Sequence, residues 1–161
     1  MGVVFTPDQI ANREIPTFES YASGIPELKR ALQGLYSDGH IYGAQLFGSS
    51  INSPRDMRIG SDVDTFVVLY EMSARDCLIP VKELASRRHL PLEINPLITL
   101  EQAKQGLHGM QQNFIAYLRT FSNLGDIIGN PPLDIIYPRT IGLTPLQEFV
   151  TFQEDNLRRL S

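Results

Sequence analysis

The chain has 161 residues, of which 42% are hydrophobic and 20% charged, so we expect one globular domain, with at most a small appendage. Its net charge of −4 argues against general nucleic-acid binding, which needs clustered cations. The sequence contains neither a run of about eighteen apolar residues nor a basic, apolar leader, and its single cysteine, Cys77, cannot form an internal disulfide. We therefore expect a cytoplasmic protein that has no membrane span.

Residues 1–26 form the first predicted segment, an irregular arm. It is rich in turn-forming residues and carries three prolines without a sustained hydrophobic period. We expect one short helix within it, near Thr6–Arg13, because that stretch opens on a Thr-Pro pair that suits a helix start. A longer helix is predicted from Pro26 to about Gly39, since leucines then recur at helical spacing.

Two strands are predicted next, at His40–Phe47 and Val63–Tyr70, joined by a polar loop. The second is so uniformly apolar that it should be covered on both faces. A helix is expected from Ser73 to about Arg88, because Ser73 and the aspartate three residues later have the spacing of a capping box. A third strand is predicted at Leu92–Ile98.

The last part of the chain is predicted to be helical. Thr99 and Gln102 indicate the start of a short helix, and further helical patterns lie at Phe114–Phe121 and from Thr144 towards Arg159. The order helix–strand–strand–helix–strand predicts an α/β (α+β) fold, a small mixed sheet with helices on one side. Residues 27–108 would form this core, and residues 109–161 a helical C-terminal extension.

Two aspartates at the start of the second strand carry the strongest chemical signal. Asp62 and Asp64 flank Val63, so they point to the same side of a strand, roughly 6–7 Å apart. Two neighbouring carboxylates repel each other, and their desolvation costs free energy. A cation between them removes both penalties, and hard oxygen ligands suit Mg²⁺.

The end of the first strand carries a second signal, the pair Gly48-Ser49. A Gly-Ser pair can turn sharply and present backbone N–H groups with a hydroxyl, which is suitable for binding a phosphate. A phosphate site beside a Mg²⁺-binding carboxylate pair is typical of phosphoryl or nucleotidyl transfer.

The two signals together resemble a known signature. Gly48-Ser49, eleven residues, and then Ser61-Asp62-Val63-Asp64 followed by an apolar strand is similar to the motif of the DNA polymerase β-type nucleotidyltransferase superfamily. The resemblance covers roughly residues 27–108. That family adds a third carboxylate from a neighbouring strand, for which Glu93 is the candidate here. The Pro-Leu-Glu run that ends at Glu93 resembles the bacterial aminoglycoside adenylyltransferases.

The resemblance implies a Mg²⁺-dependent transfer of a nucleoside monophosphate, AMP from ATP being the commonest, to a hydroxyl of a small-molecule acceptor. Asp62, Asp64 and Glu93 would hold a two-ion Mg²⁺ site, with Glu93 either the third ligand or the base that takes the acceptor's proton. The nucleotide's phosphates would contact Gly48, Ser49, Ser61, Arg55 and Arg58. Taken alone, however, Arg55 and Arg58 read as solvated loop residues and Glu93 as an ordinary exposed glutamate.

Two departures from the family pattern leave alternatives open. The roughly fifty residues after the core are too few for a large helical acceptor domain. Either the chain is a fragment, or a second copy or a partner subunit completes the acceptor site, or the substrate differs. One alternative function is adenylylation of a protein, as in nucleotidyltransferase antitoxins, but their usual arginine is not at its expected place and Arg55 is the nearest. Another is a catalytically silent module that binds a nucleotide or a partner.

Overall fold

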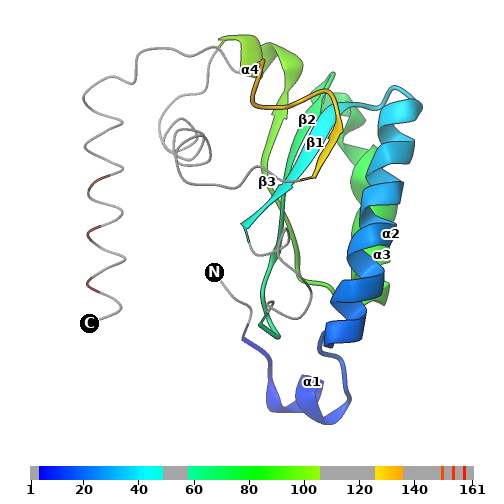
Figure 1. Ribbon diagram of the computed structural model, residues 1–161, viewed down its shortest axis with the longest axis vertical. Helices are drawn as coiled ribbons and strands as arrows, with labels where there is room; N and C mark the ends of the chain where they lie inside the picture. Colours follow the sequence, from blue (N-terminus) through cyan, green and yellow to red (C-terminus); the bar gives the residue numbers. More distant parts are fainter. Residues whose placement is uncertain are drawn as a thin grey trace.

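The computed structural model describes residues 4–48, 58–105 and 126–135, together with Val150, Glu154 and Arg158. It shows a mixed α/β fold, in which a four-stranded sheet has the strand order β3-β2-β1-β4 (Figure 1). The strands are β1 (Ile41–Phe47), β2 (Val63–Leu69), β3 (Leu92–Thr99) and β4 (Ile127–Gly129). The helices are α1 (Pro7–Ala11), α2 (Phe18–Ser37), the 3-10 helix η2 (Met72–Leu78), α3 (Ile79–Arg87) and α4 (Leu100–Gln105).

The sheet is mixed because its strands run in both directions. β1 pairs antiparallel with β2 and with β4, whereas β2 and β3 are parallel and are joined through η2 and α3. The three predicted strands are therefore confirmed to within a residue or two. The short strand β4 was not expected, since it falls within the extension that was predicted to be helical.

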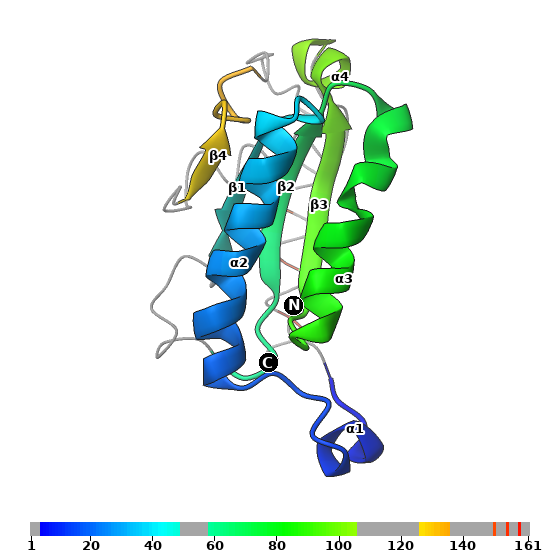
Figure 2. The same ribbon diagram turned by 90° about the vertical axis from the view of Figure 1, so that its right-hand side faces the viewer.

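Helices α2 and α3 lie side by side along one face of the sheet (Figure 2). A hydrophobic cluster fills the space between these helices and the sheet, and we call it the helix-side cluster; its buried members include Leu28, Leu32, Val63, Val67 and Val81. A smaller second cluster comprises Phe47, Phe66, Val68, Ile98, Ala103 and Leu133. Strand β2 contributes alternate residues to the two clusters, which confirms that it is covered on both faces.

Among the described helices, the prediction of helices on one side of the sheet holds for α2, η2 and α3, which all contribute to the helix-side cluster, but not for α4. Helix α4 follows directly from the end of β3 and contributes Ala103 to the second cluster. Its predicted cap is confirmed, because the Thr99 backbone N–H donates to the Gln102 side chain and the Gln102 N–H donates to the Thr99 hydroxyl. The Thr-Pro start of the short helix α1 is confirmed as well.

The predicted start of the long helix at Pro26 is wrong. α2 begins at Phe18, behind a capping box formed by Thr17 and Ser20, and Pro26 lies inside it. A proline inside a helix costs about 3 kcal/mol or more. The first turns of α2 bury Tyr21 and Ile25 in the helix-side cluster, and burying a large apolar side chain stabilises by about 1.5–3 kcal/mol, so tertiary packing outweighs the local cost.

Polar contacts tie α2 to the elements on both of its sides. The Arg88 guanidinium at the end of α3 donates two hydrogen bonds to the Glu27 carboxylate, one of them 3.1 Å long. The Lys29 ammonium forms an ion pair with Asp126, which directly precedes β4. These partly exposed contacts join α2 to the elements that flank it.

The helix predicted from Ser73 also differs from the structure. Residues Met72–Leu78 form a 3-10 helix with Glu71 at its N-cap and no side-chain cap, and the α-helix starts only at Ile79. Ser73 lies inside this 3-10 helix, and its hydroxyl donates to the Glu71 carboxylate, 3.1 Å away, so Ser73 does not occupy the N-cap position that a capping box with Asp76 requires.

Other predictions fall largely on residues that the structure does not describe. The helix at Phe114–Phe121 lies outside the described residues. In the stretch predicted to run from Thr144, only Val150, Glu154 and Arg158 are described, and each is helical and exposed. Among the helices that the structure describes, none is long and apolar enough to cross a membrane.

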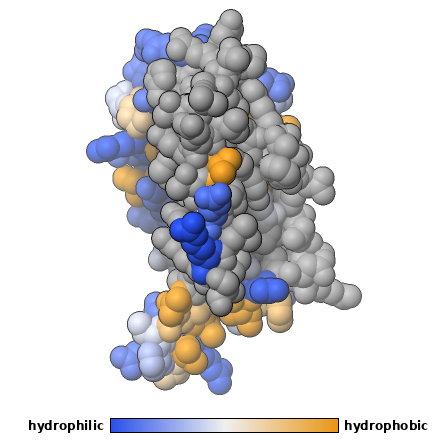
Figure 3. All heavy atoms as spheres, turned by 90° about the vertical axis from the view of Figure 1, so that its left-hand side faces the viewer, coloured by the Kyte–Doolittle hydropathy of each residue, from blue (hydrophilic) through white to orange (hydrophobic). Residues whose placement is uncertain are grey.

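Exposed apolar side chains are found at the end of the molecule that carries α1 (Figure 3). Val4, Ile10 and Phe18 are each more than half exposed there. Most of the large apolar side chains of the sheet, in contrast, are buried in the two clusters.

Candidate metal centre

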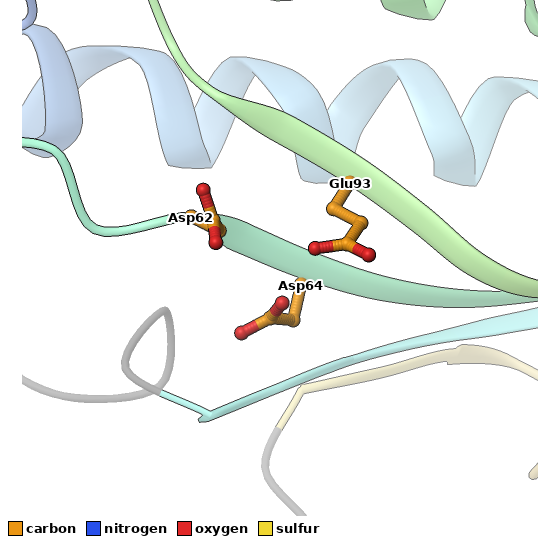
Figure 4. Close-up of side chains that lie close together, drawn as sticks. All are labelled: Asp62, Asp64 and Glu93. Carbon is orange, nitrogen blue, oxygen red and sulfur yellow. The ribbon is translucent and has the colours of Figure 1, made fainter. Parts of the chain in front are cut away.

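Three carboxylates converge at one edge of the sheet, where β2 and β3 begin. Asp62 directly precedes β2, Asp64 is the second residue of β2, and Glu93 is the second residue of β3. One oxygen from each carboxylate lies within 4.8 Å of the others, and the three side chains face a common space (Figure 4).

Strand register brings Glu93 to the two aspartates. β2 and β3 are parallel with Asp64 beside Glu93, and the Val63 N–H donates to the Pro91 carbonyl oxygen at 2.7 Å. Because side chains alternate along a strand, Val63 contacts the helix-side cluster while its two aspartate neighbours point to the opposite face. The predicted proximity of Glu93 to the aspartates is confirmed.

The three carboxylates differ in exposure and are electrostatically coupled. Asp62 is 9% exposed, Asp64 is half-buried and Glu93 is exposed. Burial, followed by the charges of Asp62 and Glu93, raises the pKa of Asp64 to about 6. Keeping this carboxylate ionised at neutral pH therefore costs free energy, which a bound cation would reduce.

The donor set fits a hard divalent cation. Three carboxylates offer only oxygen ligands, the type that Mg²⁺, Ca²⁺ and Mn²⁺ prefer over softer metals. Glu93 is open to solvent, so the remaining positions around a cation could be filled by water or by phosphate oxygens. The residues present thus suit the metal that the sequence predicts.

Gly48 follows β1 and packs against this site. Its φ of +64° is a conformation that favours glycine, and a Cβ atom added there would lie 2.5 Å from Asp64 Oδ2. The preceding residue, Phe47, pairs with Asp64 in the sheet. Backbone of the predicted phosphate-binding pair therefore lies directly beside a predicted metal ligand. Ser49 and Arg55, the other residues predicted from this loop, lie outside the described residues.

The remaining two predicted residues form the turn that leads into β2. The Ser61 N–H donates to the Arg58 carbonyl oxygen at 2.9 Å, and the Arg58 side chain is exposed. Ser61 therefore contributes main-chain hydrogen bonds to the turn. The contact of Ser61 and Arg58 with phosphates stays a prediction.

Tyr21, in the second turn of α2, is a site-adjacent residue that the sequence reasoning missed. Its hydroxyl donates to the Ser61 carbonyl oxygen at 2.9 Å and accepts from the Gly60 N–H at 3.2 Å. The sequence did indicate that Tyr21 belongs to the helix, because the helical spacing continues through Pro26; its members are Tyr21, Ile25, Leu28 and Leu32.

No family model matches the chain, and no curated protein or solved structure matches it significantly. Membership of the nucleotidyltransferase superfamily therefore stays a prediction from the sequence motif.

Proposed function

We propose that this chain is a Mg²⁺-dependent nucleotidyltransferase that transfers a nucleoside monophosphate, in the first place AMP from ATP, to a hydroxyl group of a small-molecule acceptor. The observation that carries the proposal is the convergence of Asp62, Asp64 and Glu93 beside Gly48, with carboxylate oxygens within 4.8 Å of one another. The motif spacing in the sequence supports it independently.

In this reaction the acceptor oxygen attacks the α-phosphorus of the nucleotide. A new P–O bond forms, the bond from the α-phosphorus to the bridging oxygen breaks, pyrophosphate leaves, and the hydroxyl proton passes to a base. Bound Mg²⁺ would supply neutralisation of the charge that grows on the α-phosphate and on the leaving pyrophosphate.

The three carboxylates are suited to different roles because they differ in solvent exposure. The more buried carboxylates, Asp62 and Asp64, are suited to holding the metal. Glu93 is exposed at the rim, where it is the third ligand or accepts the proton of an approaching hydroxyl. Because Gly48 has no side chain, its backbone approaches the Asp64 carboxylate closely, so a phosphate bound by that backbone would lie close to the metal.

Calorimetry tests the nucleotide site. Each of the four common nucleoside triphosphates is titrated into the wild type and into Asp62→Asn/Asp64→Asn, with and without Mg²⁺. A matched control is Asp38→Asn/Asp134→Asn, which removes the same charge at two exposed positions. We expect binding that requires Mg²⁺ in the wild type and the control, and no binding in the site variant.

Absence of binding to any nucleotide by folded wild-type protein would contradict the proposal, as would binding that is indifferent to Mg²⁺ and to the site variant. Release of pyrophosphate on addition of hydroxyl-bearing acceptors then separates an enzyme from a silent nucleotide-binding module. A protein substrate in place of a small molecule would show as a labelled polypeptide when α-labelled nucleotide is used.

A further inference from the structure

A buried tyrosine hydroxyl contacts the two residues that directly precede Asp62. Tyr21 is 0% exposed, and its ring belongs to the helix-side cluster. Its hydroxyl donates one hydrogen bond to Ser61 and accepts one from Gly60, residues that lie 40 and 39 positions further along the chain. The phenol thus links the start of α2 to the turn that enters β2.

Asp62 lies between two fixed backbone positions. On its N-terminal side the Ser61 carbonyl is held by Tyr21, and on its C-terminal side the Val63 N–H is held by Pro91 at 2.7 Å. Gly60 has a φ of +92°, so this turn has a conformation that other residues rarely adopt. Holding both flanking residues restricts the directions in which the Asp62 carboxylate can point.

The Tyr21 hydroxyl is suited to this contact because its oxygen atom can both donate and accept a hydrogen bond. Each N–H and C=O group of a buried turn needs a partner, and a phenol can satisfy one of each. A tyrosine hydroxyl is protonated at neutral pH, as the donor to Ser61 must be, and burial raises the pKa of Tyr21 further.

We infer that Tyr21 is a positioning residue of the metal centre: its hydroxyl fixes the Gly60–Ser61 turn and thereby holds the Asp62 carboxylate within reach of Asp64 and Glu93. This inference rests on the proposed function in one respect, namely that the three carboxylates bind a divalent cation.

The test measures binding of Mn²⁺ alone by electron paramagnetic resonance, in wild type and in Tyr21→Phe, at a temperature where both are fully folded. The substitution keeps the buried ring and removes only the hydroxyl. We expect the dissociation constant of the variant to be about three- to tenfold higher, because both hydrogen bonds of the hydroxyl are lost and only part of their free energy is transmitted to the metal site.

Tyr36→Phe is the matched control. Tyr36 lies on the same helix, about 22 Å along its axis from Tyr21, and among the described residues its hydroxyl has no hydrogen-bond partner. Removal of the Tyr36 hydroxyl in Tyr36→Phe should leave the Mn²⁺ affinity unchanged.

Two further measurements separate positioning from a general loss of stability. Amide exchange at Gly60 should accelerate in Tyr21→Phe, while exchange in the middle of β2 should not. If Tyr21 acts through Asp62, then Tyr21→Phe should change Mn²⁺ affinity less than about twofold in an Asp62→Asn background, since coupled residues are not additive.

The outcomes distinguish this inference from the proposed function. Equal Mn²⁺ affinity of wild type and Tyr21→Phe, or an equal effect of Tyr21→Phe with and without Asp62, would overturn the role of Tyr21 alone. Absence of Mn²⁺ binding by the wild type would overturn the metal centre itself and the role of Tyr21 with it.

Discussion

Asp64 is the residue at which the requirements of folding and of metal binding conflict. Its pKa rises from an ordinary 3.8 to about 6, because the carboxylate is partly buried and lies beside Asp62 and Glu93. Between these two pH values the folded state binds more protons than the unfolded state. The free energy of unfolding therefore falls as pH rises through this window, and above pH 6 the whole penalty is present.

Asp64→Asn is therefore expected to stabilise the metal-free protein at neutral pH. We expect the free energy of unfolding in chelator to rise by about 1 kcal/mol near pH 7.5, a value discounted for the partial exposure of the carboxylate, and the gain to vanish near pH 4. Urea denaturation at both pH values measures this. The exposed Asp134→Asn serves as control, and a variant less stable than wild type near pH 7.5 would contradict the expectation.

The same carboxylate predicts the pH dependence of metal binding. A carboxylate must lose its proton to bind a cation, so below pH 6 Asp64 protonation competes with the metal. We expect Mn²⁺ affinity to be level above that pH and to fall by up to about tenfold per pH unit below it. Paramagnetic resonance titrations across this range test the prediction, and an affinity that falls only near pH 4 would contradict it.

Gly48 provides a second test at this scale, Gly48→Ala. The new Cβ would lie 2.5 Å from Asp64 Oδ2, in a backbone conformation of φ +64°. We expect a loss of stability of about 1–2 kcal/mol from the strained backbone together with a clear loss of Mn²⁺ affinity.

Gly39→Ala is its matched control. Gly39 has a similar φ of +74°, but nothing lies within 4 Å of its added Cβ. The Gly39→Ala variant should lose about as much folding stability as Gly48→Ala and keep its Mn²⁺ affinity. Equal Mn²⁺ affinity in both variants would show that the contact of Gly48 with Asp64 is unimportant.

Much of the candidate site was predictable because it depends on local spacing. Strand alternation alone places Asp62 and Asp64 on the same face. The prediction that Glu93 lies near them required only the assumption that its strand is beside β2. Tyr21 could not be placed in this way, since its partner is 40 residues distant and its helix appeared to begin after it. Contacts between distant segments depend on packing, which spacing does not encode.

At the scale of elements, α2 is the long helix that packs against one face of the sheet. Its buried residues contact the helix-side cluster, and its charged residues pair with α3 and with the residue before β4. Helix propensity alone would disfavour a proline in its middle, so its stability depends on that packing.

Leu28→Ala tests this dependence. Leu28 is 0% exposed in the helix-side cluster, so its truncation should leave a cavity and lower the free energy of unfolding by about 2–5 kcal/mol. Gln33→Ala, on the exposed side of the same helix, should change stability by less than about 0.5 kcal/mol. Urea denaturation compares them, and similar values for the two would mean that α2 does not depend on its packing.

The elements that sequence reasoning found are those with strong periodicity. The uniformly apolar β2 and the Thr99-capped α4 were predicted within a residue or two. β4 has only three residues, too few to show an alternating pattern, and it exists because it can pair with β1. The predicted Ser73 capping box is absent because the 3-10 helix begins before Ser73, with Glu71 at its N-cap.

For the whole molecule, metal binding should be coupled to stability. A cation that binds only the folded state stabilises it by mass action, by about 2.7 kcal/mol when its free concentration is 100 times its dissociation constant. Mg²⁺ should therefore raise the melting temperature of the wild type and leave that of Asp62→Asn/Asp64→Asn unchanged. An equal rise in both proteins would place the bound ion elsewhere.

The position of Tyr21 decides where this chain can be shortened. A protein that began at Glu27 would retain every carboxylate of the site and all four strands, so by its motif it would look complete. It would lack the first turns of α2, the buried Tyr21 and Ile25, and with them the link to the Gly60–Ser61 turn. We therefore expect the smallest fragment that folds and binds a cation to begin no later than Thr17, ten residues before residue 27, where the sequence motif alone would start it.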